Sequence, residues 1–149
     1  MHSHIAGTWR KMWKEHTDEL KAKAIGWRQQ PAILRIERPS NLDRARRLGY
    51  KAKQGFVVVR MRTGRGGMRK QRPKAGRRPK HLGVVRIKQA DSMRKVAERR
   101  VVERYPNMQV IGSYYLYKDG KYYWFECILV DKYHPAIFND QELQHTLKF

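Results

Sequence analysis

Residues 108–131, MQVIGSYYLYKDGKYYWFECILVD, contain two long apolar and aromatic runs on either side of Asp119-Gly120. An Asp-Gly pair between two such runs is the strongest short-range signal for a β-hairpin, because both residues tolerate the left-handed backbone of a tight turn. β-branched and aromatic residues also favour strands. We therefore predict strands over residues 108–117 and 121–131, with Glu126 the only charged side chain inside the second.

Further strands are predicted before the hairpin. Residues 56–61 (FVVVRM) are rich in β-branched residues and form the clearest of them. Because side chains alternate across a strand, its continuation places Arg60 and Arg62 on one face. Residues 32–36 and 84–87 are short apolar stretches that predict two weaker strands.

Helical periodicity is clearest near the N-terminus, where one apolar stripe recurs every three or four residues and ends before Pro31. Its spacing favours packing against a core over a role as a stacking platform for bases. A break at Thr17-Asp18 is the alternative, because Asp18 would cap a second helix. The stripe consists of Trp9, Trp13, His16, Leu20, Ala24 and Trp27.

Two later helices complete the pattern. One is short, beginning after Ser40 or Asn41 and ending near Gly49, and the other spans residues 91–105 with Asp91 as its cap. The order of elements predicts an α+β fold, in which a small, mostly antiparallel sheet carries helices on one face. We expect one domain over residues 1–149, with an extended basic arm at about 64–83.

Charge is distributed very unevenly along the 149 residues, whose formal net charge is +21. The 47 positions between Asp43 and Asp91 hold 17 Lys and Arg and no acidic residue. From Val101 onward, five basic residues face six acidic ones. Unneutralised positive charge opposes compaction. The sequence therefore predicts a polyanionic partner for the middle of the chain and a packed scaffold at its end.

The densest basic segment is residues 64–81, GRGGMRKQRPKAGRRPKH, with eight Lys and Arg, four Gly and two Pro. It has almost nothing to bury, so we expect it to be disordered alone and to become ordered on a nucleic acid. Its glycines would let backbone amides approach phosphates. The Gly-Lys-Ser/Thr ending of a P-loop is missing. A plain linker is the alternative, but linkers are usually weakly charged.

A second contact is predicted at residues 43–55, DRARRLGYKAKQG. Arg44 and Arg47 share one helical face, and Leu48 faces the core. Tyr50 either stacks on an unpaired base or is a buried structural tyrosine. RNA is favoured over DNA because no helix-turn-helix or zipper is recognisable, and because long cationic loops suit the interior of a folded RNA.

Other chemistry is poorly supported. Cys127 is the single cysteine, so an internal disulfide is excluded, and its apolar strand predicts a buried, inert thiol. The six histidines lack paired metal-ligand spacing. Candidate catalytic acids such as Glu126 and Asp131 lie outside the basic region. No signal peptide or membrane span is visible. We expect a soluble intracellular protein that is no enzyme and needs no metal or cofactor.

Several segments together resemble one family, the archaeal and eukaryotic large-subunit ribosomal protein fifteen-e, with an archaeal character. They are residues 36–39 (IERP), 42–55 (LDRARRLGYKAKQG), 65–67 (RGG), 125–131 (FECILVD) and 134–137 (HPAI). The run that ends in KAKQG is the most specific. Family members usually continue into an Arg-, Gly- and His-rich tail. This sequence stops at Phe149, so either the chain is truncated or this member lacks the tail.

The resemblance implies an α+β protein without catalytic activity, embedded in large-subunit rRNA and next to other large-subunit proteins of the cytoplasmic ribosome. It implies RNA contacts by Arg44, Arg46, Arg47, Tyr50, Lys51, Lys53, Arg65, Gly66 and Gly67. The absence of acidic residues between Asp43 and Asp91 predicts further RNA contacts by Arg60, Arg62, Arg69, Lys70, Arg72, Lys74, Arg77, Arg78 and Lys80. The alternatives are a non-ribosomal nucleic-acid-binding or RNA-chaperone protein and, third, an RNA-cutting or RNA-modifying enzyme that uses Glu126 or Asp131. No small-molecule substrate or membrane partner is expected.

Overall fold

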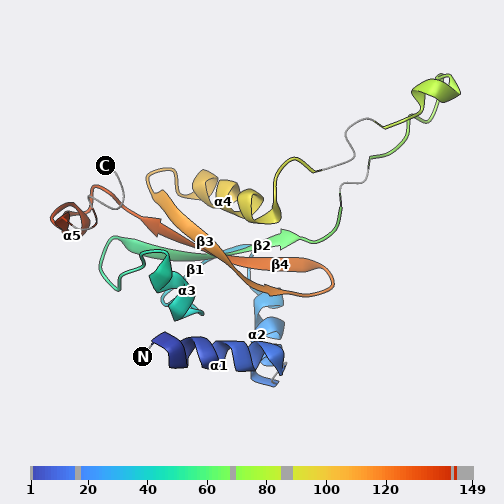
Figure 1. Cartoon of the computed structure of the whole chain (residues 1–149). Helices are drawn as coiled ribbons and strands as arrows, with labels where there is room; N and C mark the ends of the chain where they lie inside the picture. The colour runs from blue at the N-terminus through green and yellow to red at the C-terminus, as the bar shows by residue number, and fades with distance from the viewer. Residues whose placement is uncertain (1, 16–17, 68–69, 85–88, 142, 144–149) are drawn as a thin grey trace.

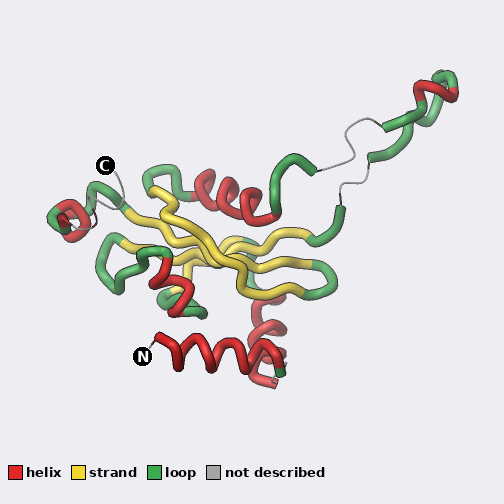
Figure 2. The backbone as a smooth tube through the Cα atoms, viewed as in Figure 1, coloured by secondary structure: helices red, strands yellow, loops and turns green. Residues whose placement is uncertain are grey.

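A four-stranded antiparallel sheet forms the centre of the protein (Figures 1 and 2). The computed structural model describes residues 2–15, 18–67, 70–84, 89–141 and 143. The strand order is β1-β2-β4-β3. The described elements are α1 (His2–Lys14), α2 (Asp18–Gln29), β1 (Ile33–Ile36), α3 (Leu42–Arg47), β2 (Phe56–Gly64), the 3-10 turn η1 (Pro79–His81), α4 (Met93–Arg104), β3 (Gln109–Lys118), β4 (Tyr122–Val130) and α5 (Pro135–Phe138). The predicted α+β class is confirmed.

The predicted hairpin is present and its turn is fixed by one side chain. Asp119 Oδ1 accepts hydrogen bonds from the backbone N–H groups of Lys121 at 2.7 Å and Tyr122 at 2.6 Å. Strands β3 and β4 pair along their length, with two irregularities on β3 that let its side chains change phase. The hairpin thus places β4 in the interior of the sheet, between β3 and β2.

Helices cover both faces of the sheet, so the prediction that they lie on one face is wrong. On one face, Leu20, Ala24 and Trp27 of α2 pack with Trp124 and Ile128 of β4. The opposite face carries a second core, which joins Ala97 and Val101 of α4 to Val59, Met61, Phe125, Cys127 and Leu129. The reason lies in β4 itself. Every side chain from Trp124 to Val130 is buried, and a strand that is apolar on both sides needs a cover on both sides.

The N-terminal stripe belongs to two helices, so the predicted alternative of a break is the one found. Helix α2 begins at Asp18. The carboxylates of Asp18 and Glu19 lie in its first turn, where they stabilise the positive N-terminal end of the helix dipole. Leu20, Ala24 and Trp27 are buried, as the stripe predicted. Trp9 is half-buried against the core, and Trp13 is half-buried with its ring 5.9 Å from that of Tyr117. His16 lies outside the described residues.

The start of α4 differs from the prediction. Helix α4 is capped by Ser92, whose Oγ accepts from Lys95 N at 3.2 Å, and not by Asp91. Asp91 lies one residue too early for that bond and instead pairs with Arg99 at 2.9 Å. Of the strand predicted at 84–87, all residues but Val84 lie outside the described residues.

A buried carboxylate ties the sheet to the segment before α3. Glu126 is 0% exposed and lies in register between Arg60 on β2 and Tyr114 on β3. It accepts hydrogen bonds from Ser40 N at 3.0 Å, Ser40 Oγ at 2.6 Å and the Tyr114 hydroxyl, and it pairs with Arg60 Nε at 3.4 Å. Burial and the adjacent Glu126 charge raise the pKa of Tyr114, so its hydroxyl stays a donor. The role of Glu126 is therefore structural.

We expect Glu126→Gln to lower the free energy of unfolding by about 3 kcal/mol, because breaking a buried ion pair leaves an uncompensated charge on Arg60. Urea unfolding at neutral pH measures the change. Lys21→Met is the control, since its pair with Asp18 is exposed and should contribute little. A Glu126→Gln protein as stable as the wild type would show that the contacts of this carboxylate with Ser40 and Arg60 do not stabilise the fold.

Candidate nucleic-acid interface

Helix α3 presents three arginines outward because its other side is anchored to the core. Asn41 caps the helix by accepting from Arg44 N at 3.1 Å, and Ala45 is fully buried. Gly49, with φ +95°, ends it in the left-handed region that favours glycine. The exposed residues are then Arg44, Arg46 and Arg47. Arg47 pairs with Asp43 at 3.2 Å, whereas the side chains of Arg44 and Arg46 form no ion pair with any described residue.

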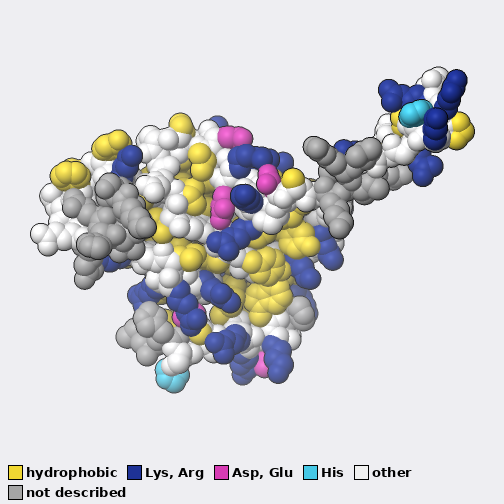
Figure 3. All heavy atoms as spheres, turned by 45° about the horizontal axis from the view of Figure 1, so that its top comes forward, with side chains coloured by type: hydrophobic (Ala, Val, Ile, Leu, Met, Phe, Trp, Pro, Cys, Tyr) yellow, Lys and Arg dark blue, Asp and Glu magenta, His cyan; other side chains and the backbone are white. Residues whose placement is uncertain are grey.

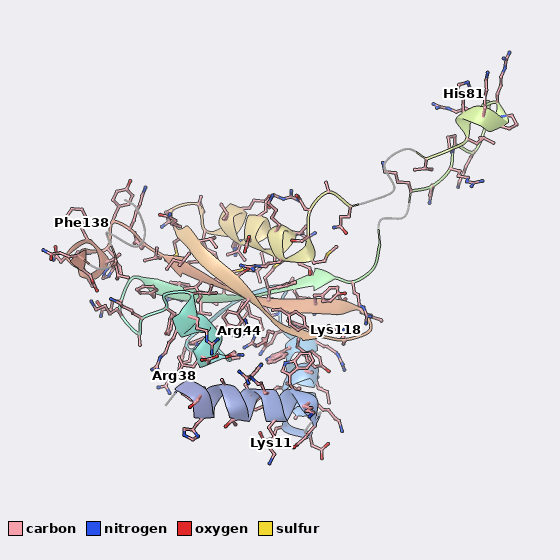
Figure 4. All side chains as sticks on the ribbon, viewed as in Figure 1. Lys11, Arg38, Arg44, His81, Lys118 and Phe138 are labelled. Atoms are coloured by element: carbon pink, nitrogen blue, oxygen red, sulfur yellow. The ribbon has the colours of Figure 1, made fainter. Side chains whose placement is uncertain are left out.

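A groove beside α3 gathers cations that lie far apart in the sequence. Its volume is about 580 Å³, and α1, α3, α4 and β3 contribute to its walls. In Figure 4, α3 with Arg44 lies directly above α1. Arg10 of α1 and Arg94 of α4 join Arg44 and Arg47 in the lining. The remaining lining residues are Ala6, Trp9, Trp13, Asn41, Asp43, Leu48, Ser113, Tyr114 and Tyr115.

Sequence reasoning missed Arg10 and Arg94, because neither lies between Asp43 and Asp91. Arg94 Nε donates to Ser113 Oγ at 2.8 Å and lies 3.3 Å from Glu98, which holds it at the margin of β3. Arg10 forms no ion pair with any residue in the described part of the chain. In the sequence, Arg10 is marked only by its position next to Trp9 of the apolar stripe. That position does not predict that Arg10 lies near the arginines of α3.

The residues after α3 face protein groups. Tyr50 is half-buried and lies edge-on against Phe56, with ring centroids 5.9 Å apart, so it packs on the core. Lys51 and Lys53 reach Asp140 at 3.4 and 2.5 Å. Gly55 has φ +91°, and an added Cβ would lie 2.5 Å from Ile137 Cγ1. The C-terminal turn is therefore packed closely onto this basic segment.

The two arginines of β2 share a face, as predicted, but differ in their surroundings. Arg60 is 12% exposed, donates to Gln30 Oε1 and Ser40 Oγ at 3.1 Å, and lies 4.8 Å from the centroid of the Trp27 ring. Because its guanidinium is engaged inside the protein, we leave Arg60 out of the proposed interface. Arg62 lies nearer the surface, 4.6 Å from the centroid of the Tyr122 ring, and donates to the Arg28 carbonyl at 2.8 Å.

The basic arm leaves the sheet where β2 ends. Arg65 is exposed there and donates to the Asp119 carbonyl at 2.8 Å, and Gly66 takes φ +127° before Gly67. Residues 70–84 lie well away from the sheet, with His81 near the tip (Figures 1 and 4). None of their side chains is buried. The exposed cations are Lys70, Arg72, Lys74, Arg77, Arg78 and Lys80, whereas Arg69 lies outside the described residues.

The structure thus divides the predicted RNA contacts into separate surfaces. Arg44 and Arg47 line the groove and Arg46 lies on the same helix, whereas the arm projects from the other end of the sheet (Figure 1). Figure 3 shows Lys and Arg side chains spread over the visible face, with few Asp and Glu among them. Arg72, Lys74, Arg77, Arg78 and Lys80 form no ion pair with any described acidic residue. The arm is therefore the part whose charge the protein itself neutralises least.

Sites for other chemistry do not form in the described part of the chain. Within it, no three His, Cys, Asp or Glu side chains gather as metal ligands would. Cys127 is fully buried, and burial raises the pKa of its thiol to about 12, so the reactive thiolate is suppressed. Asp131 caps the turn after β4 by accepting from Tyr133 N at 3.1 Å. None of the described helices combines the length and apolar character that crossing a membrane requires.

Comparison with known protein families identifies the family of this chain. A family model described as Ribosomal L15, of the L15e (fifteen-e) type, matches residues 1–148. The chain belongs to this L15e family. It is a protein of the large ribosomal subunit, structural and not enzymatic, and it works in the ribosome as part of a ribonucleoprotein. The expectation of a ribosomal role is therefore confirmed over the non-ribosomal and enzymatic alternatives.

The contact of Asp140 with two lysines gives a test by pH. The hydrogen bond from Lys53 lowers the pKa of Asp140 from its ordinary value of 3.8 to about 2. Since the folded pKa lies below the unfolded one, the stabilisation is complete above pH 3.8 and is lost as the pH falls through about 2. We expect the carboxyl carbon of Asp140 to titrate near 2 by NMR, and to titrate closer to 3.8 in Lys53→Met. Lys21→Met, far along the chain, should leave it unchanged; equal midpoints in all three proteins would contradict the contact.

Proposed function

We propose that this L15e chain binds large-subunit rRNA through two surfaces: the outer side of α3 with the adjoining groove, and the basic arm. Residues 1–149 act as one rRNA-binding domain, with the arm at about 64–83 enclosed by RNA in the cytoplasmic ribosome. The contacts include Arg44, Arg46 and Arg47 on α3 and Arg62, Arg65, Gly66, Gly67, Arg69, Lys70, Arg72, Lys74, Arg77, Arg78 and Lys80 along the arm and at its base. Neighbouring large-subunit proteins complete its surroundings.

The exposed charge of the arm is the observation that supports this proposal most. Its described residues bury no side chain, and five of its cations have no acidic partner in the described chain. Packing on the protein therefore offsets little of the conformational entropy of this segment, and these five cations keep an unmatched charge. Phosphates supply both the counter-charge and, through release of their bound cations, the driving force. Arginine adds a forked set of donors that matches phosphate oxygens.

Lys51 and Lys53 contribute in a more limited way. Asp140 lies within hydrogen-bond or ion-pair distance of both, so an approaching phosphate has to compete with a carboxylate already in place. We therefore assign the larger share of phosphate binding to α3 and the arm. Tyr50 supports the segment by packing against Phe56 and leaves base stacking to other side chains.

Salt dependence tests the proposal. Filter binding of the full chain to large-subunit rRNA should give a slope of log K against log salt on the order of −7 to −9 if about ten phosphates are contacted. Arg44→Gln with Arg46→Gln should reduce the slope by roughly one unit per lost contact, and Arg77→Gln with Arg78→Gln should do the same. Arg100→Gln with Arg104→Gln, two exposed residues of α4, is the matched control and should change it little.

Two outcomes would contradict the assignment. An unchanged slope in both double variants would place the phosphates elsewhere on the protein. Equal affinity for large-subunit rRNA and for an unrelated single-stranded RNA would instead favour an RNA-chaperone activity without a fixed site.

Protease accessibility tests the arm separately. In the free protein, trypsin should cleave first between Lys70 and Lys80, because the backbone there is exposed and lies away from the sheet. Binding to large-subunit rRNA should suppress these cuts, while cleavage at Arg99 and Arg100 on α4 serves as the internal control. Equal cleavage of the arm in the free and bound protein, with binding confirmed in the same sample, would show that RNA does not enclose it.

A further inference from the structure

The groove beside α3 follows the free edge of the sheet. Strand β3 is the last strand in the order β1-β2-β4-β3, and three of its residues line the groove. Helices α1 and α3 lie on one side of this edge and α4 on the other. The volume of about 580 Å³ falls within the roughly 300–1,000 Å³ of sites that hold small molecules. The hollow is thus large enough for a single flat ligand.

Aromatic side chains form much of its wall and are held in place by the protein. The Trp13 Nε1–H donates to the Leu116 carbonyl at 3.1 Å, which fixes the indole at the strand edge. The Trp13 and Tyr115 rings lie 5.7 Å apart, and Tyr115 is 39% exposed although Phe125, its partner in register on β4, is buried. Trp9 adds a third half-buried aromatic ring. Such fixed, partly exposed rings are suited to stacking against a flat aromatic group.

The charges around these rings specify an anionic ligand. Four arginines line the groove, whereas Asp43 is the only acidic side chain among the described residues of its lining. Asp43 is already paired with Arg47, and Arg94 is held by Glu98 and Ser113. Arg10 and Arg44 approach from α1 and α3 without an ion-pair partner in the described chain. Two guanidinium groups beside an aromatic wall match the two parts of a nucleotide, phosphate and base.

We infer that this groove takes one unpaired nucleotide of the bound RNA, with its base against Trp9, Trp13 and Tyr115 and its flanking phosphates on Arg10 and Arg44. The inference rests on the proposed rRNA-binding function and adds a base-binding pocket to it. Because stacking requires a base that has left its helix, the pocket selects an irregular, single-stranded position of the RNA. It does so without reading a particular base, since every base has a π-face.

The test separates base from phosphate. Two synthetic seven-unit chains are compared at low ionic strength by fluorescence anisotropy: a fully abasic phosphodiester chain and the same chain with one central adenosine. Their phosphate counts are equal, so only the base differs. The wild-type protein should bind the adenosine-bearing chain about tenfold more tightly, as expected for stacking of one base on aromatic side chains.

Variants assign the effect to the groove. Trp9→Leu on α1 and Tyr115→Leu on β3 should each bring the affinity ratio toward one, and their positions on different elements guard against failure of either to fold. Arg10→Gln with Arg44→Gln should weaken both chains equally and keep the ratio. Tyr133→Leu is the matched control, because Tyr133 is 76% exposed and lies outside the groove lining.

Equal affinity of the wild type for both chains, or no measurable binding of either, would overturn the pocket. If large-subunit rRNA still binds with the expected salt slope, only this inference fails. Loss of that rRNA binding would count against the proposed function itself. A ratio that survives both aromatic substitutions would place the base elsewhere and also overturn the assignment.

Discussion

The four contacts that the buried carboxylate of Glu126 makes with Ser40, Tyr114 and Arg60 organise the side of the protein that carries α3. A carboxylate without solvent is tolerated only when its oxygens are fully hydrogen-bonded and its charge is matched. Glu126 meets both conditions by binding Ser40, Tyr114 and Arg60. Ser40 directly precedes Asn41, the cap of α3. An interaction within the sheet therefore determines where the arginines of α3 lie, which links the core to the proposed RNA surface.

The double-sided burial of β4 has a second consequence for the interface. With α2 on one face and α4 on the other, the sheet has little exposed face left for a ligand. What remains available is its edge at β3, the outer side of α3 and the arm that leaves β2. RNA-binding proteins that use a sheet face display their aromatic residues there. In this L15e protein the corresponding aromatic side chains mostly pack inward, while Tyr115 at the edge is exposed and Trp9 and Trp13 of α1 are half-buried beside it.

The arm and the body illustrate two ways of managing charge. In the body, several cations have protein partners: Arg28 pairs with Asp119, Arg99 with Asp91, and Lys53 with Asp140. The described arm offers no such partners to five of its cations. A protein that keeps unmatched charge on an unpacked segment depends on its partner to order it. In the proposed function, rRNA is the partner that supplies the missing counter-charge.

The sequence by itself determined what local physics controls. The Asp-Gly turn, the β-branched strand predicted at 56–61, the capped helix before Gly49 and the basic arm all follow from short-range preferences. Several distinct short segments were enough to indicate the family. Tertiary structure alone decided which faces are covered and which cations meet. Arg60 and Arg62 are two residues apart on one face, yet only Arg60 faces a buried carboxylate. Arg10, Arg44 and Arg94 converge on one groove because three helices pack around a sheet edge, and contacts between residues so distant in the chain leave no periodic trace in its sequence.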